Sequence, residues 1–173
     1  MATSLVLTLI GRDRPGLVEE LAQAVSAHDG SWENSRMARL GGSFAGILEV
    51  GVPDERAAEL FKTLHGLEER GLRVVVEDAG GAPPDEAYRE LRLELVGQDR
   101  PGIIRDISST LSASGINVVE LSTRTRPAPM SGETLFSASA LLHQPSRESV
   151  TRLRENLEKL ASDLMVEISI TAE

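Results

Sequence analysis

The fold is decided by a short stretch that occurs twice, first as Gly11-Arg12-Asp13-Arg14-Pro15-Gly16-Leu17-Val18 and again, 86 residues later, as Gly97-Gln98-Asp99-Arg100-Pro101-Gly102-Ile103-Ile104. Each copy follows a strand-like run, Leu5 to Ile10 in the first case and Leu91 to Val96 in the second. Each precedes apolar residues at helical spacing. Proline is favoured just inside the start of a helix, because its missing N–H would have no partner there. The repeat therefore predicts two copies of one small domain.

The elements that follow also occur in one order. After the first helix, Ser31 to Leu40 and Ser43 to Val52 have the composition of two strands, joined by a tight turn at Gly41-Gly42. Pro53-Asp54 then begins a second helix, and Leu72 to Glu77 forms a fourth strand. The first half is therefore predicted to be β-α-β-β-α-β.

The second half repeats this order with a longer hairpin loop. Its middle strands are expected at Ile116 to Thr125 and Glu133 to His143, with a loop at 126–132 between them. A helix over Val150 to Leu160 and a strand over Met165 to Ile170 complete it.

These patterns predict an α+β fold of two ferredoxin-like units, each an antiparallel sheet with both helices on one face. We expect the first unit at residues 1–80, a Gly-, Ala- and Pro-rich linker at 81–88, and the second unit at 89–173. Val6 to Ile10 is largely apolar on both faces of its strand. We therefore expect the open sheet face of the first unit to be covered by the second unit or by another subunit.

Composition excludes several classes of protein. The chain has 173 residues, a net charge of −9 and no cysteine, which excludes a disulfide scaffold, a thiolate metal site and a cysteine nucleophile. Both halves are acidic and only 3% of residues are aromatic, so direct nucleic-acid binding is disfavoured. The apolar runs are too short for a membrane span or a signal peptide. We expect a soluble, cytoplasmic protein that does not bind membranes.

Motifs of enzymes and cofactor sites are missing from the sequence. Gly41-Gly42-Ser43-Phe44-Ala45 differs from the nucleophile motif Gly-x-Ser-x-Gly only in its last residue. It lies in a predicted hairpin, however, whereas a nucleophile elbow needs a turn from a strand into a helix. No phosphate-binding loop or dinucleotide fingerprint occurs. The three histidines, at positions 28, 65 and 143, are too far apart in the chain to suggest a metal site. We expect a non-enzyme without metal or cofactor.

The strand, the Asp-Arg-Pro-Gly turn into a helix, and the β-α-β-β-α-β order together resemble the ACT domain, a small regulatory module of amino-acid metabolism. Two such units and nothing else resemble the glycine cleavage system transcriptional repressor family, and the stretch from Asn34 to Phe44 fits the first domain of that family. The resemblance runs from about Ser4 to Ile170. It implies regulation through a small ligand or a protein partner, without catalysis.

The resemblance also implies where a ligand would bind. ACT domains that bind amino acids hold them at the turn before the first helix, often across an interface with a neighbouring ACT unit. That turn is Asp13 to Leu17 in the first unit and Asp99 to Ile103 in the second. The first N–H groups of a helix lack internal partners and attract a carboxylate. The ligand-binding residues that we expect are Asp13, Arg14, Gly16, Leu17, Asp99, Arg100, Gly102, Ile103 and Asn117.

The second unit fits this pattern better than the first. Asp99 or the side-chain oxygen of Asn117 could accept a hydrogen bond from an ammonium group. Gly115-Ile116-Asn117 matches the Gly-x-Asn turn of ligand-binding ACT domains, whereas Ser31 takes the place of Asn117 in the first unit.

Each candidate residue also has a structural interpretation. Asp13 and Asp99 could cap the helices that follow them. Asn117 could be an ordinary turn residue, and Arg14 and Arg100 exposed side chains. The single tryptophan, Trp32, is expected in a core or an interface.

Three functions stay open at this point. The first is a homodimeric regulator that senses a small amino acid, glycine or a close relative, and acts on a protein partner such as a transcription factor. The second is a ligand-free tandem module that presents a protein-binding surface. The third is a minor enzymatic activity in an interface pocket, which the missing catalytic motifs disfavour.

Overall fold

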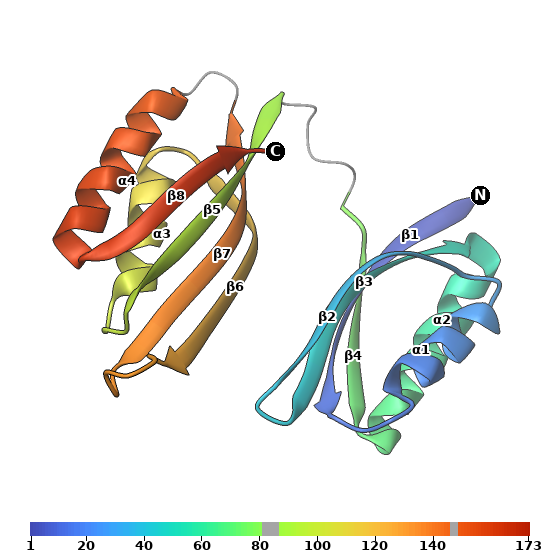
Figure 1. Cartoon of the computed structure of the whole chain (residues 1–173). Coiled ribbons are helices and arrows are strands. Elements are labelled where there is room, and N and C mark those ends of the chain that lie inside the picture. Colours follow the sequence, from blue (N-terminus) through green and yellow to red (C-terminus); the bar gives the residue numbers. More distant parts are fainter. Residues whose placement is uncertain (81–86, 146–148) are drawn as a thin grey trace. The chain divides into compact units, whose positions relative to one another are not determined.

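The chain folds into two compact units, Met1–Pro83 and Pro84–Glu173, which are drawn in Figure 1. The computed structural model describes residues 1–80, 87–145 and 149–173. Within these residues, each unit has a four-stranded antiparallel sheet with two α-helices on one face. This confirms the predicted α+β fold of two ferredoxin-like units.

The first unit is built in the predicted order. Its strands pair in the order β2-β3-β1-β4. Its elements are β1 (Ala2–Arg12), α1 (Leu17–Ser26), β2 (Ser31–Leu40), β3 (Ser43–Pro53), α2 (Asp54–Gly66), a short 3-10 helix η1 (Leu67–Arg70) and β4 (Leu72–Asp78).

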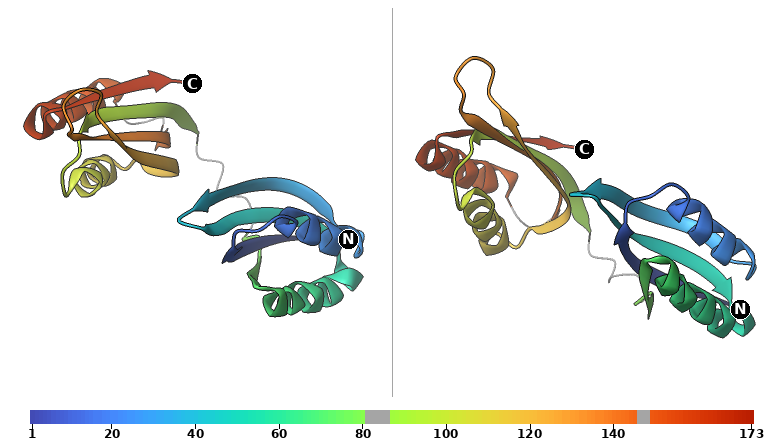
Figure 2. Two further views of the ribbon diagram at one scale, coloured as in Figure 1. Left: turned by 60° about the horizontal axis from the view of Figure 1, so that its bottom comes forward. Right: turned by 90° about the horizontal axis from the view of Figure 1, so that it is seen from below.

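The second unit repeats this arrangement, with the sheet order β6-β7-β5-β8. Its elements are β5 (Tyr88–Gln98), α3 (Ile103–Ala113), β6 (Asn117–Pro127), β7 (Thr134–Pro145), α4 (Val150–Leu164) and β8 (Val166–Ala172). The views in Figure 2 show α3 and α4 on the same face of this sheet.

Two predicted boundaries of the second unit differ from the structure. The hairpin loop predicted at 126–132 begins later, because β6 continues to Pro127 and the Ala128 N–H donates to the Glu133 carbonyl at 2.7 Å. Most of the predicted linker, 81–86, lies outside the described residues, and Tyr88 already belongs to β5.

Each unit has a hydrophobic core of its own between its sheet and its helices. The two cores share the same pattern at an offset of 86 residues. In each unit, alternate residues of the first strand and residues on one face of the first helix are buried against one another. The matching buried residues are Leu5, Leu7, Leu9, Leu17, Leu21 and Val25 in the first core and Leu91, Leu93, Leu95, Ile103, Ile107 and Leu111 in the second. Trp32 packs half-buried against the first core.

The sheet face away from the helices differs in character between the units. In the first unit, Ile10, Ile47 and Val75 lie on this face and are each about half exposed. In the second unit, the matching face carries the charged side chains of Arg92 and Glu94. That a second unit or another subunit covers the apolar face of the first unit stays a prediction.

No helix among the described residues is long and apolar enough to cross a membrane.

Candidate functional site

The two repeated turns, between β1 and α1 and between β5 and α3, have the same backbone geometry. The residue before each helix is a glycine in the left-handed region, Gly16 at φ 92° and Gly102 at φ 93°. The Asp13 N–H donates to the Gly42 carbonyl at 3.0 Å, and the Asp99 N–H donates to the Thr134 carbonyl at 2.8 Å. Each turn is therefore held against the neighbouring hairpin.

The interpretation of Asp13 and Asp99 as helix caps is wrong. Glycine occupies the cap position of both helices, and no side chain of the described residues caps either one. The Asp13 carboxylate instead pairs with Arg39 of β2 at 2.7 Å. The first N–H groups of α1 and α3 therefore have no side-chain acceptor, which suits them to bind an anion.

The arginines of the two turns are engaged differently. Arg14 donates two hydrogen bonds to the Glu20 carboxylate, at 2.8 and 3.0 Å, and a third to the Arg70 carbonyl at 3.1 Å. Asp106 occupies the position that matches Glu20, and it binds its neighbour Arg105 at 2.8 Å. Neither Arg100 nor the Asp99 carboxylate has a polar partner in the described parts of the chain. The turn of the second unit is therefore the one whose charged groups are available to a ligand.

Arg105 belongs to this candidate site, although it was not among the expected residues. A Cβ built on Gly102 would lie 2.9 Å from an Arg105 guanidinium nitrogen, so this side chain extends over the turn. The matching residue in the first unit is Glu19. A comparison of the two repeats at the offset of 86 would have shown this exchange. The first turn of α3 is therefore more favourable to a carboxylate than that of α1, which carries Glu19 and Glu20.

Asn117 lies far from the turn within its own unit. It starts β6 opposite His143, and His143 pairs with Glu90 near the beginning of β5. The Asp99 turn follows the other end of β5, nine positions along the strand from Glu90, a span of about 30 Å at the usual rise of a strand. Asp99, Arg100, Gly102 and Ile103 thus lie together, and Asn117 of the same unit does not join them. In the first unit the matching residue is Ser31, which starts β2.

The Arg14–Glu20 pair predicts a pH dependence of the first unit. The hydrogen bond from Arg14 is the main cause that lowers the pKa of Glu20 below its ordinary value of 4.5. A lowered folded-state pKa stabilises the fold above the ordinary pKa, and this stabilisation is lost as pH falls through the lowered value. We therefore expect Glu20→Gln to destabilise the first unit near neutral pH and to have little effect in strong acid.

Thermal unfolding of the wild-type protein and of Glu20→Gln, each at about pH 7 and about pH 3, checks this prediction. Glu19→Gln removes the same charge from the same turn of α1 without touching Arg14, and serves as the control. An equal loss of stability in Glu20→Gln at both pH values would contradict the prediction.

The described residues also contain no group of three or more acidic or histidine side chains that could hold a metal ion.

Comparison with known proteins identifies each half of the chain. A family model of the ACT domain matches residues 3–77, and a second ACT domain model matches residues 91–160. The glycine cleavage system transcriptional repressor of Escherichia coli (strain K12) is 26% identical over 168 residues, which cover 96% of this chain and 88% of the repressor.

Solved structures reproduce the fold over the whole chain. The crystal structure of an unknown protein from Galdieria sulphuraria covers 100% of this chain and 99% of its own, with 29% identity and a TM-score of 0.89. A candidate glycine cleavage system transcriptional repressor, 19% identical, covers 100% and 98% with a TM-score of 0.71, and shows the shared fold.

Proposed function

We propose that this chain, which belongs to the ACT-domain family and carries two ACT domains in tandem, is a non-catalytic regulatory protein that senses a small amino acid and acts through a protein partner. Similarity to the glycine cleavage system transcriptional repressor supports the regulatory role. By this similarity the proposed ligand is glycine or a close relative, the proposed partner a transcription factor, and the proposed compartment the cytoplasm.

The free turn of the second unit is the observation that carries the proposal. Within the part of the chain that the structure describes, no side chain caps its helix start and neither Asp99 nor Arg100 has a polar partner, and Arg105 extends over it. An amino acid carries one carboxylate and one ammonium group. The carboxylate would bind the first N–H groups of α3 beside Arg105, and the ammonium group would donate to Asp99.

The position of Asn117 supports a homodimer. Because Asn117 lies at the other end of the sheet from Asp99, one ligand could contact both residues only if they came from two ACT units. We propose that two copies of the chain supply them, so that the turn of one protomer faces the start of β6 in its partner.

Calorimetric titration of the full chain with glycine, serine and alanine tests the site. We expect saturable binding that Asp99→Asn weakens by about tenfold or more, a loss of about 1.4 kcal/mol. Asp13→Asn is the matched control in the first unit, where Arg39 already neutralises the carboxylate, and it should leave binding unchanged. Unchanged binding in Asp99→Asn would refute the assignment of the site.

A mixing experiment tests the homodimer separately. Asp99→Ala and Asn117→Ala should each abolish binding alone. After mixing at equal amounts and exchange of subunits, half of the dimers are mixed and each has one intact site of two, so binding should return to about a quarter of the wild-type sites. Absence of recovery, with exchange confirmed by mass spectrometry, would show that the two residues do not share a ligand across two chains.

A ligand-free interaction module is the second candidate function, and one observation favours it. The exposed apolar side chains of Ile10, Ile47 and Val75 form a surface on which a partner could pack. This candidate predicts no binding of any of the twenty amino acids at about 10 mM, a concentration at which a dissociation constant near 0.1 mM would stabilise the protein by about 2.7 kcal/mol.

A further inference from the structure

Gln144 of β7 is a buried polar residue whose side chain has no hydrogen-bond partner among the described residues. It is 1% exposed, and neither its Oε1 nor its Nε2 makes a hydrogen bond within the part of the chain that the structure describes. It lies two residues after the core residue Leu142, and therefore on the sheet face that the helices cover. A native protein rarely buries both ends of an amide unpaired, so this residue requires an explanation.

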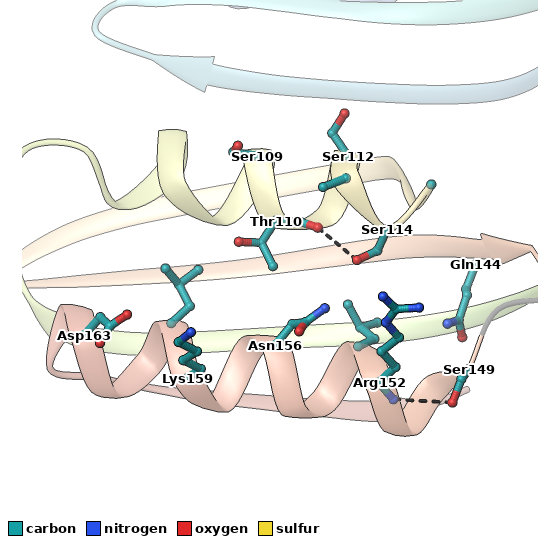
Figure 3. A pocket seen from close by; sticks show the side chains of 14 residues that line it. Ser109, Thr110, Ser112, Ser114, Gln144, Ser149, Arg152, Asn156, Lys159 and Asp163 are labelled. Atoms are coloured by element: carbon teal, nitrogen blue, oxygen red, sulfur yellow. Dashed lines mark hydrogen bonds between the residues drawn. The ribbon is translucent and has the colours of Figure 1, made fainter.

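The amide lines a groove between α3 and α4, shown in Figure 3. The groove has a volume of about 840 Å³, within the range of small-molecule sites. Ser109 and Ser112 of α3 line one side, and Arg152, Asn156 and Lys159 of α4 line the other. The unpaired amide and these polar groups therefore border the same space.

The first unit shows which residue occupies the matching position in the other repeat. Val52 pairs with Thr3, and Gln144 pairs with Arg89, so the two are matching positions at the offset of 86 between β1 and β5. Val52 is 1% exposed and is part of the first core.

The ends of the first-unit helices are also bridged. Thr63 of α2 lies within hydrogen-bonding distance of the His28 ring, at 3.2 Å, and Arg56 pairs with Asp29 at 3.4 Å. The residues that match His28 and Asp29 in the second unit are Ser114 and Gly115, which both line the groove. Ser114 donates instead to the Thr110 carbonyl of its own helix at 3.1 Å, and Gly115 has no side chain. The second unit thus has a polar groove beside Gln144, where the first unit has the core residue Val52 and polar contacts between α2 and the residues that follow α1.

We propose that the groove between α3 and α4 binds a small anionic ligand with a planar edge on which a hydrogen-bond donor and an acceptor lie side by side. The Gln144 amide offers one donor and one acceptor in a plane, which pairs with such an edge in a nucleobase or a primary carboxamide. Arg152 and Lys159 supply positive charge for a phosphate or a carboxylate, and they outnumber the one carboxylate of the lining, that of Asp163. The groove therefore suits a nucleotide or a carboxamide-bearing acid.

This site is separate from the turn that we assign to an amino acid. The groove is lined by residues from the C-terminal half of α3, which starts at Ser109, and by Ser114 and Gly115 just after the helix, whereas the turn precedes the N-terminus of α3. The inference does not depend on the proposed function, because it rests on Gln144 and on the difference between the two units.

Calorimetric titration of the full chain tests the groove with four probes. AMP has both the edge and the anion, adenosine has the edge alone, ribose 5-phosphate has the anion alone, and N-acetyl-L-glutamine has a carboxamide and a carboxylate without an ammonium group. We expect AMP or N-acetyl-L-glutamine to bind, and Gln144→Val to weaken that binding by about tenfold or more. A response to AMP assigns the edge to a nucleobase, and a response to N-acetyl-L-glutamine assigns it to a carboxamide.

Matched variants separate the groove from a general loss of structure. Gln144→Val installs the residue of the first unit, and it should raise the unfolding temperature of the ligand-free protein because it removes an unpaired buried amide. Lys159→Ala should weaken AMP and leave adenosine unchanged, whereas Lys62→Ala on α2 should change neither. Failure of both AMP and N-acetyl-L-glutamine to bind, or binding that Gln144→Val does not alter, would overturn the proposal.

Discussion

Leu7→Ala should lower the stability of the first unit by about 2–5 kcal/mol and leave the unfolding of the second unit unchanged. Leu7 is 0% exposed at the centre of β1, and its side chain fills space between the sheet and the two helices. The truncation removes buried methyl and methylene groups and leaves a cavity that the surrounding side chains refill only in part. The first and second cores share no residue, so the loss should stay within one unit.

The repeat supplies a matched variant in the second unit for this experiment. Leu93 lies 86 residues after Leu7, is 1% exposed and occupies the same place in the second core. Leu93→Ala should therefore destabilise the second unit by a similar amount and spare the first.

Hydrogen exchange followed by mass spectrometry distinguishes the units, because peptides of β1 and β5 report on each core separately. Faster exchange in both units after either substitution would show that the two domains unfold as one.

Most of the fold could be predicted because the repeat supplied the same evidence twice. Strand ends were less predictable. β6 continues to Pro127 because it pairs with β7 across that position, and no local feature of Arg126 or Pro127 reveals such pairing. Local patterns indicate where apolar residues alternate, whereas the length of a hairpin depends on contacts between two separate segments.

The positions of the two turns were predicted better than the contacts of their side chains. The turns lie where the Asp-Arg-Pro-Gly stretches placed them, but the capping interpretation failed because the cap position is a left-handed glycine. The engagement of Arg14 with Glu20 requires α1 to bring the two side chains together. Gln144 gave no signal in its own sequence context, because its burial depends on a sheet position that only the register fixes.

Gly11→Ala, which adds a single methyl group, should lower the stability of the first unit by about 1–3 kcal/mol. Gly11 pairs with Leu72 of β4, and a Cβ built on it would lie 2.5 Å from the Gly71 carbonyl oxygen. That oxygen belongs to the backbone and cannot swing aside as a flexible side chain would. Gly71 itself has φ +86° and its N–H donates to the Glu68 carbonyl at 2.9 Å, which further restricts its movement.

The consequence should extend to the turn that follows β1. Arg14 donates to the carbonyl of Arg70, the neighbour of Gly71, so a displacement of this backbone also loosens the contact between the turn and η1. Gly66→Ala is the control, because Gly66 has helical φ −62° and open space around its Cα, and alanine there should stabilise by about 0.4–1 kcal/mol. Thermal unfolding of both variants compares the same added methyl group in the two settings. Opposite signs would establish that the first glycine of the repeated stretch is required for the close approach of β1 to the end of η1, and equal stabilities would refute it.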